Sequence, residues 1–308
     1  CGGAFACRGR GVRVTRILVT GVNGQVGFEL LRACQPLGEV IGADRTRCDL
    51  ADLDALRNAL REIRPDVIVN PAAYTAVDAA EQDEALATRI NGEAVSLIAE
   101  EARRAQALVV HYSTDYVFDG TKDAPYTEAD QPSPLNAYGR SKLVGEHALL
   151  ASQADWLCLR TSWVYASRGK NFLRTVLRLA REREEMRIVA DQFGAPTPAR
   201  LIAETTAHIV RQSLQARREG RFASGLLHLT SRGATSWHGF ASAIHARLST
   251  SAQAPKLKSL VPITTAEYPL PAARPRNSRL DCSALEHRFD LRLPEWETGV
   301  ELCMAELE

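Results

Sequence analysis

Two polar side chains, Tyr138 and Lys142, have the spacing of an acid–base pair. Their segment, "NAYGRSKLVGEHALL", has a helical pattern, and residues four apart share one face of a helix. A free tyrosine has a pKa of about 10 and exchanges its proton poorly at neutral pH. An ammonium group nearby favours the phenolate and lowers that pKa. The same lysine can bond a nicotinamide ribose, although the spacing alone is as typical of a solvated pair.

A row of hydroxyl and carboxyl groups follows an apolar strand in "ALVVHYSTDYVFDG". In a doubly wound sheet, ligands bind outside the carboxyl ends of the strands. A hydroxyl at this position can bond a substrate carbonyl while Tyr138 supplies a proton, and we assign that role to Thr114. Three neighbours are interpreted as structural or substrate-orienting: Ser113, Asp115 and Tyr116.

A glycine loop follows the first expected strand in "VTGVNGQVGFEL", with Gly21, Gly24 and Gly27 at three-residue spacing. A pyrophosphate at a helix N-terminus needs a tight turn and bare backbone N–H groups, which glycines provide. Glycine turns are common, but Asp44 ends the second strand about twenty residues on, where a carboxylate can bind an adenosine ribose. The loop and the acid together predict dinucleotide binding.

The residues around Asp44 leave the choice between NADH and NADPH open. Asp44 favours NADH because its charge repels a 2′-phosphate, whereas Arg45 and Arg47 can pair with that phosphate. Asp49 and Leu50 come next and fit a position at the adenine. A cap for the following helix is an equally good interpretation of Asp49.

Alternating apolar patterns place these residues on a repeated strand–helix framework. The expected strands are 16–21, 39–44, 65–70, the segment running into 111, and 156–160; the expected helices are 53–63, 79–105, 136–151 and 171–184. Such repeats predict an α/β fold, a Rossmann-type doubly wound parallel sheet with a smaller C-terminal α/β substrate lobe.

The chain is expected to divide into three parts. Residues 1–13, Gly- and Arg-rich and without periodicity, are interpreted as a disordered leader or upstream sequence. Residues 14–168 form the dinucleotide-binding Rossmann domain. Residues 169–308 form mainly the substrate-binding lobe, with segments near 186–215 and 226–230 returning to the core.

The bulk composition is that of an ordinary globular protein. The net charge of +1 over 308 residues gives no electrostatic basis for binding nucleic acid or an anionic membrane. No apolar run approaches the roughly 18 residues of a membrane span. The seven cysteines have neither CxxC nor metal-ligand spacing, so no disulfide framework or metal site is expected and a reducing cytoplasm fits best.

The motifs together resemble the extended short-chain dehydrogenase/reductases, and within them the dTDP-4-dehydrorhamnose reductases. The resemblance runs in order from about residue 15 to 302. The segments that carry it are "RILVTGVNGQVGFEL", "RPDVIVNPAAYTAVDAAE", "VVHYSTDYVFDG", "SPLNAYGRSKLVGE", "RTSWVYA", "NF", "DQFGAPT" and "RPRNSRLD".

The resemblance implies reduction of the C4 ketone of a dTDP-sugar, dTDP-4-dehydro-6-deoxy-L-mannose, to dTDP-L-rhamnose by NADPH or NADH. Tyr138 would protonate the alkoxide, Lys142 would tune Tyr138, and Thr114 would polarise the ketone. The matching cofactor positions are Gly24, Gln25, Val26, Asp44, Asp49, Leu50, Ala73, Tyr74 and Thr75, beside Gly21, Gly27, Tyr138 and Lys142. The matching substrate positions are Thr114, Asp115 and Trp163, with Arg274 or Arg276 meeting the diphosphate.

One departure from the resemblance concerns a metal. Some similar proteins form a homodimer bridged by Mg²⁺ through clustered glutamates. Glu29 and Glu297 match two of those positions, but Arg200 stands at the third. An arginine repels a cation, so the Mg²⁺ site is doubtful here, and a monomer and a differently built homodimer are both open.

Two alternative functions compete with the reductase. The first is another sugar-nucleotide ketoreductase or epimerase of the same superfamily; an epimerase would retain NAD⁺ without net consumption. The second is a non-catalytic dinucleotide-binding regulatory subunit, resembling the β-subunit of methionine adenosyltransferase. The presence of Thr114, Tyr138 and Lys142 argues against the second.

Overall fold

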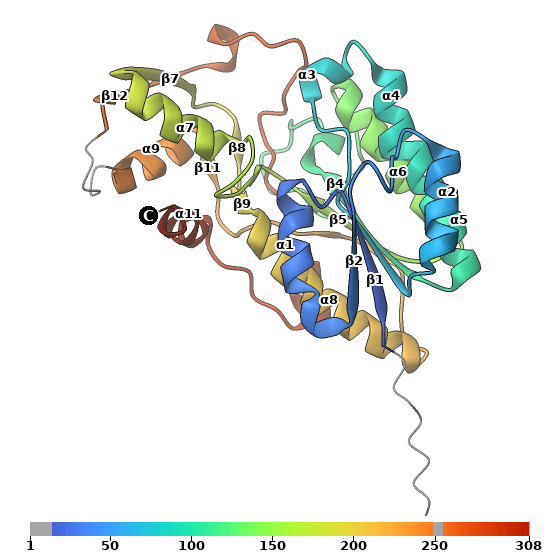
Figure 1. Cartoon of the computed structure of the whole chain (residues 1–308). Coiled ribbons are helices and arrows are strands. Elements are labelled where there is room, and N and C mark those ends of the chain that lie inside the picture. Colours follow the sequence, from blue (N-terminus) through green and yellow to red (C-terminus); the bar gives the residue numbers. More distant parts are fainter. Residues whose placement is uncertain (1–13, 249–254, 308) are drawn as a thin grey trace, which may run out of the picture.

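The computed structural model describes residues 14–248 and 255–307. Its centre is a six-stranded parallel sheet in the order β10-β5-β4-β3-β1-β2 (Figure 1). The strands are β1 Arg16–Thr20, β2 Glu39–Ala43, β3 Val67–Asn70, β4 Leu108–Thr114, β5 Asp155–Thr161 and β10 Gly225–His228. The predicted doubly wound parallel sheet is confirmed.

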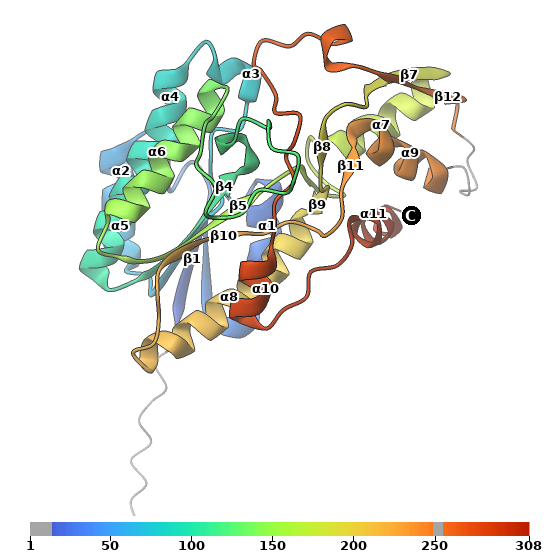
Figure 2. The same cartoon turned by 180° about the vertical axis from the view of Figure 1, so that it is seen from behind.

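Helices cover both faces of this sheet because its strands alternate apolar residues to either side (Figures 1 and 2). In β1, Ile17 and Val19 join the core beneath α1 and α8, while Leu18 joins the core on the opposite face. The first face carries α1 Gln25–Ala33 and α8 Ala199–Arg218; the second carries α2 Leu53–Ile63, α5 Ala94–Ala105 and α6 Ala137–Ala151.

The long helix expected over 79–105 is broken into pieces. It consists of α3 Val77–Ala80, α4 Glu84–Thr88, a π-helical turn Arg89–Glu93, and α5. Asp83 starts α4 afresh, since its side chain accepts a hydrogen bond from the Leu86 N–H at 3.1 Å. The π-turn directs Asn91 inward, where its side chain bonds both backbone groups of Tyr74, at 2.8 and 3.0 Å.

A smaller lobe follows the fifth strand and has its own apolar core. It contains α7 Phe172–Glu182, α9 Trp237–Leu248, α11 Trp296–Ala305 and a parallel pair of strands, β7 Glu185–Val189 and β12 Ser259–Ile263 (Figure 1). Short elements connect it to the sheet: β6 Val164–Tyr165, β8 Phe193–Gly194, β9 Thr197–Pro198, β11 Thr235–Ser236 and α10 Ser283–Phe289.

The segments after residue 168 that belong with the sheet include β10 and α8. β10 pairs with β5 at one edge, and α8 contributes Ile202, Ile209 and Val210 to the core shared with α1. The segment 185–189, by contrast, is a lobe strand. The domain boundary at 168 stays a prediction, and the expected leader, residues 1–13, lies outside the described residues. In the ranges 14–248 and 255–307, no helix combines the length and apolarity of a membrane span.

Candidate functional site

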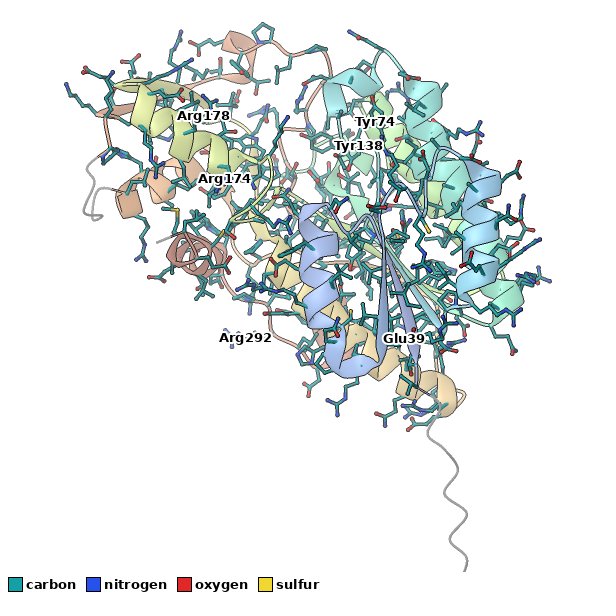
Figure 3. The ribbon with its side chains drawn as sticks, in the orientation of Figure 1. Glu39, Tyr74, Tyr138, Arg174, Arg178 and Arg292 are labelled. Carbon is teal, nitrogen blue, oxygen red and sulfur yellow. The ribbon has the colours of Figure 1, made fainter. Side chains whose placement is uncertain are left out.

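A cavity of about 670 Å³ opens at the carboxyl ends of the parallel strands, between the sheet and the lobe. Its walls include residues that follow β1, β2, β3, β4 and β5, together with Tyr138 and Lys142 of α6 and Trp237 of α9. Figure 3 shows Tyr74 and Tyr138 at this end of the sheet, with Glu39, the first residue of β2, at the opposite end. The location agrees with the general position of ligands in such sheets.

The glycine loop fits a pyrophosphate. Gly21 has φ +58°, and a Cβ on Gly27 would lie 2.3 Å from the Gly21 carbonyl oxygen. The turn and the helix therefore pack against each other without room for side chains. Gly24 precedes α1 with no side-chain cap, so the first N–H groups of α1 remain available to an anion.

Asp44 lies on the cavity wall directly after β2. Its Oδ1 accepts hydrogen bonds from the Thr46 hydroxyl at 2.6 Å and the Thr46 N–H at 3.0 Å. These bonds lower the pKa of Asp44, so the group is a carboxylate that can accept from ribose hydroxyls. Arg45 also lines the cavity, whereas Arg47 is not among its lining residues.

The two interpretations of Asp49 are distinguished by the structure. The cap of α2 is Asp52, whose side chain accepts from the Ala55 N–H at 3.0 Å. Asp49 instead lines the cavity beside Leu50, and its Oδ1 accepts from the Ala51 N–H at 2.9 Å. Asp49 and Leu50 thus lie on the cavity side of the turn that leads into α2.

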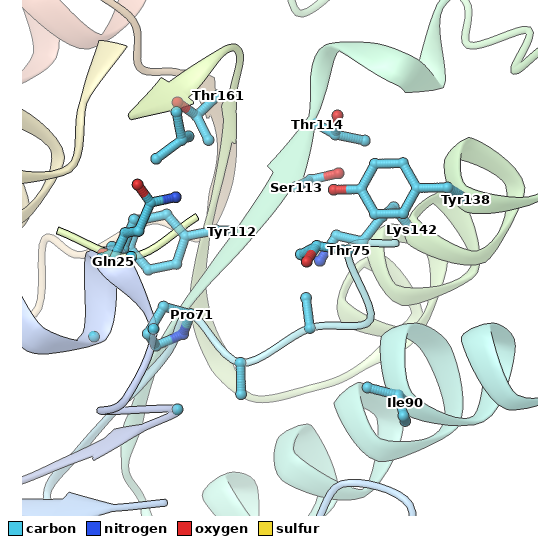
Figure 4. A pocket seen from close by; sticks show the side chains of 18 of the residues that line it. Gln25, Pro71, Thr75, Ile90, Tyr112, Ser113, Thr114, Tyr138, Lys142 and Thr161 are labelled. Atoms are coloured by element: carbon cyan, nitrogen blue, oxygen red, sulfur yellow. The ribbon is translucent and has the colours of Figure 1, made fainter. Parts of the chain in front are cut away.

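Thr114, Tyr138 and Lys142 form one wall of the cavity. Thr114 is the last residue of β4, and Tyr138 lies in the first turn of α6, where Asn136 caps the helix by accepting from the Gly139 N–H at 2.8 Å. Figure 4 shows the Tyr138 ring directed toward Ser113 and Thr114, with Lys142 beside it. The three residues chosen from the sequence are therefore brought together.

The electrostatics of this wall are dominated by burial. Burial and the nearby Asp115 carboxyl raise the pKa of Tyr138, and a hydrogen bond with Thr114 opposes them. Burial also lowers the pKa of Lys142 to about 8. The Lys142 Nζ lies 3.2 Å from His111 Nε2. The expected lowering of the Tyr138 pKa by Lys142 stays a prediction.

Asp115 is a buried acid next to the proposed proton donor. It is 3% exposed, and the Thr114 hydroxyl donates to its Oδ1 at 3.0 Å. Burial raises the pKa of Asp115 to about 7, against hydrogen bonds from Ser278 and Thr114. Asp115 therefore changes its charge close to neutral pH, which is unusual for an aspartate.

Trp163 forms the lobe side of the cavity together with Trp237. The two indoles stack with centroids 3.6 Å apart and an interplanar angle of 9°. Trp163 has φ +47°, a conformation that costs energy for a bulky residue and is found mainly where surrounding contacts hold it. Gly194 is one such contact, because a Cβ there would lie 2.6 Å from Trp163 Cε2.

Most of the other predicted cofactor residues also line the cavity: Gly21, Gly24, Gln25, Val26, Gly27, Ala73 and Thr75. Tyr74 and Arg274 are not among its lining residues. The Arg274 guanidinium makes a bidentate ion pair with Asp78, at 2.6 and 2.7 Å, and is thereby held against α3. The roles assigned to Tyr74 and Arg274 stay predictions.

The cavity also contains residues that the sequence analysis did not select. Trp237 comes from a helix whose aromatic content is equally typical of a core. Arg168 and Lys170 bring positive charge to the wall after β6. Lys170 offered a signal, since the sequence has only five lysines and this one lies just before the "NF" segment of the resemblance.

Of the two glutamates considered for Mg²⁺, Glu29 is paired with Arg200. The Arg200 Nε lies 3.2 Å from Glu29 and its Nη1 lies 2.5 Å from Glu306, whereas Glu297 is exposed at the start of α11. Arg200 thus joins α1 to the end of α11 within one chain. Within the described residues, no cluster of three or more His, Cys, Asp or Glu side chains has a metal-binding arrangement.

Comparisons with known proteins identify a family whose model covers most of the chain. Residues 15–308 match the family described as RmlD substrate binding domain. A dTDP-4-dehydrorhamnose reductase of Burkholderia thailandensis is 55% identical, over 95% of this chain and 99% of that protein. The Salmonella typhimurium protein of the same name is 45% identical, over 94% and 97%. The crystal structure of dTDP-4-dehydrorhamnose reductase from Bacillus anthracis in complex with NADP is similar with a TM-score of 0.85, 33% identity, and coverage of 95% of this chain and 99% of that one.

Proposed function

We propose that this chain, which belongs to the family of dTDP-4-dehydrorhamnose reductases, reduces the C4 ketone of dTDP-4-dehydro-6-deoxy-L-mannose to give dTDP-L-rhamnose. It is an NAD(P)H-dependent oxidoreductase acting on a nucleotide sugar. The observation that carries the proposal is the single cavity that extends from the glycine loop to Thr114, Tyr138 and Lys142.

The cofactor-binding part of the cavity is formed by the glycine loop and the ends of β2 and β3. The first backbone N–H groups of α1, at Gln25 and Val26, face the position of the pyrophosphate, and the Asp44 carboxylate accepts from the adenosine ribose. Bound NADPH or NADH supplies the hydride that reduces C4. Ala73 and Thr75 lie along the same wall after β3.

The catalytic part of the cavity supplies protons and hydrogen bonds. Thr114 donates a hydrogen bond to the ketone oxygen, which favours the charge that develops there. Tyr138 then gives its hydroxyl proton to the alkoxide oxygen, a step typically worth 10²–10⁴-fold in rate. Lys142 bonds the nicotinamide ribose and its positive charge favours the tyrosinate that forms.

The part of the cavity assigned to the nucleotide sugar lies toward the lobe. Trp163 offers an aromatic face for the sugar, and Trp237 holds that face in place by stacking at 3.6 Å. Arg168 and Lys170 bring two cations to the same side of the cavity, which suits a diphosphate. Asp115 orients the sugar or Thr114 from the opposite wall.

The thiols of the chain support a proposal about its cellular compartment. Five cysteines are buried and free: Cys34, Cys48, Cys158, Cys282 and Cys303. Free buried thiols are typical of proteins in reducing compartments. We therefore place the reductase in the cytoplasm.

The test is the loss of NADPH absorbance with the purified chain and dTDP-4-dehydro-6-deoxy-L-mannose, which the preceding dehydratase and epimerase generate in the same vessel. Oxidation that depends on the sugar, with dTDP-L-rhamnose as product, is the expected result. A parallel series with NADH ranks the two cofactors. Dinucleotide binding without oxidation would instead favour a regulatory subunit, and isomerised sugar without net oxidation would favour an epimerase.

A further inference from the structure

A continuous chain of buried hydrogen bonds runs beneath the cavity floor and ends at Lys142. The Thr20 hydroxyl lies 2.6 Å from Asn70 Oδ1, Asn70 Nδ2 lies 3.1 Å from His111 Nδ1, and His111 Nε2 lies 3.2 Å from Lys142 Nζ. The four residues come from β1, β3, β4 and α6. None is more than 2% exposed, although strands buried on both faces usually carry apolar residues at such positions.

The direction of each hydrogen bond determines where the protons of these four side chains lie. With Thr20 donating to Asn70 Oδ1, the amide nitrogen donates to His111 Nδ1, and a neutral imidazole then carries its proton on Nε2. That N–H points at Lys142, which accepts it only as an uncharged amine. This arrangement of hydrogen bonds therefore matches an uncharged Lys142 amine.

Rotation of the Asn70 amide by half a turn reverses every bond of the chain. The amide nitrogen then donates to the Thr20 oxygen, and Asn70 Oδ1 accepts from a proton on His111 Nδ1. The lone pair of His111 Nε2 is left to accept from the Lys142 ammonium. Both arrangements give a partner to the oxygen and nitrogen of the Asn70 amide and to both ring nitrogens of His111, so neither leaves those buried atoms unpaired.

We propose that His111, oriented by Asn70, is a positioning residue that holds the Lys142 amino group at one place on the cavity wall, with or without its extra proton. The proposal rests on the proposed function, in which Lys142 serves the cofactor ribose and Tyr138. It gives the two buried polar residues beneath the cavity a role that packing alone does not require.

Among the buried groups beneath the cavity floor, Lys142 is the one that titrates close to neutral pH. Cys158, opposite His111 on β5, is a thiol whose pKa is raised by burial, and Glu146 of α6 is paired with Arg160 at 2.6 Å. Burial lowers the pKa of His111 well below its ordinary value, so the ring stays neutral. On the cavity side, the neighbouring titratable groups are Tyr138 and Asp115.

Two substitutions of His111 separate the bond to Lys142 from the bond to Asn70. In His111→Gln, the longer amide reaches the position of Nε2 and keeps a partner for Lys142. In His111→Asn, the shorter amide reaches only the position of Nδ1 and leaves Lys142 without one. Both variants replace the same buried ring by an amide, so they differ mainly in the bond to Lys142. His111→Asn should lose about 10²-fold in kcat, the scale of an ångström-sized misplacement. His111→Gln should lose clearly less.

A second readout does not depend on turnover. The affinity for NADPH should change with pH as Lys142 loses its proton, and fluorescence titrations across pH 6–10 give the midpoint of that change. His111→Asn removes the acceptor for a buried ammonium and should move the midpoint down. Asn70→Asp fixes a proton on His111 Nδ1, which favours the ammonium, and should move it up by about 1 pH unit or more. His147→Gln, on the exposed side of α6, serves as the control.

Opposite shifts in the two variants, with the control unchanged, are the expected result. Equal kcat in His111→Asn and His111→Gln, together with midpoints that stay at the wild-type value, would overturn the proposal. Wild-type turnover in the same assay tests the reductase function separately. A chain that binds NADPH with the predicted shifts but does not oxidise it would retain the role of His111 and reject the proposed substrate.

Discussion

The Thr114 hydroxyl donates to the Asp115 carboxylate, with 3.0 Å between Oγ1 and Oδ1. The same Thr114 oxygen accepts from the Tyr116 N–H at 3.1 Å. A hydroxyl has one proton, so Thr114 cannot donate to a ketone while it donates to Asp115. A protonated Asp115 can donate to Thr114 instead, and this frees the threonine proton for the substrate. The role of Thr114 therefore depends on the charge of Asp115.

The first prediction is that kcat/KM falls as the pH rises through about 7, where Asp115 loses its proton because burial has raised its pKa to about 7. Asp115→Asn provides an amide N–H that donates to Thr114 at every pH, so the fall near pH 7 should disappear. Only the later change due to Lys142, with a pKa of about 8, should remain. Rates measured from pH 6 to 9 check this, and an unchanged fall in Asp115→Asn would remove Asp115 from the control of Thr114.

The second prediction concerns stability, and its sign follows from the same pKa. Because the pKa of Asp115 is raised on folding from 3.8 to about 7, the folded chain holds more protons than the unfolded chain between these values. The contribution of Asp115 to the free energy of unfolding therefore falls as the pH rises through this window. Asparagine does not titrate, so Asp115→Asn should be more stable than wild type at pH 8, by on the order of 2–4 kcal/mol.

Urea unfolding at pH 5 and pH 8 measures this difference. The advantage of Asp115→Asn should be smaller at pH 5, where nearly all of the wild-type Asp115 is protonated in the folded chain. An advantage of equal size at both values would show that packing, rather than the charge of Asp115, determines the effect.

The third prediction is that Tyr138→Phe lowers kcat by about 10²–10⁴-fold, the range expected for loss of a positioned acid. The ring and its edge contact with Tyr116, at 5.9 Å between centroids, are retained. The affinity for NADPH should therefore stay close to that of wild type. Steady-state rates and a fluorescence titration of NADPH check the two parts, and wild-type turnover in Tyr138→Phe would assign the proton to another group.

The sequence predicted the parts of the site that depend on local spacing. The glycines at 21, 24 and 27 needed only a strand before them and a helix after them, and Thr114 needed only to end a strand. The helix expected at 53–63 was predicted to the residue, because its apolar positions face one core. Each of these features is specified by neighbours within a few positions in the chain.

The features that the sequence did not predict depend on contacts between distant segments. Trp237 reaches Trp163 across 74 positions of the chain, and nothing near Trp237 indicates that partner. The π-turn within 79–105 depends on Asn91, which turns inward to bond the backbone of Tyr74. The Arg274 guanidinium is held by the Asp78 carboxylate. Asp78 lies far from the motif around Arg274 in the sequence.

The fourth prediction is that Asp44→Ala weakens NADH more than NADPH. The Asp44 carboxylate can accept from the 2′-hydroxyl of NADH but repels the 2′-phosphate of NADPH, which Arg45 can still meet from the same wall. Dissociation constants for both dinucleotides check this. Thr46→Val is the matched control, because it removes the hydroxyl bond to Asp44 at 2.6 Å while the charge stays. An equal loss for both dinucleotides would place Asp44 away from the ribose.

The last prediction is that Trp237→Ala raises the KM for the nucleotide sugar by about tenfold while the affinity for NADPH stays nearly unchanged. Trp163 retains φ +47° against a conformational cost of roughly 1–3 kcal/mol. The indole of Trp237, stacked on it at 3.6 Å, opposes that cost, and tenfold in affinity corresponds to about 1.4 kcal/mol. Without the stack, Trp163 can leave the cavity wall, and the face for the sugar is lost. Trp237→Phe retains a stacking ring and should keep most of the affinity, whereas similar KM values in both variants and in wild type would mean that Trp163 holds its conformation without its partner.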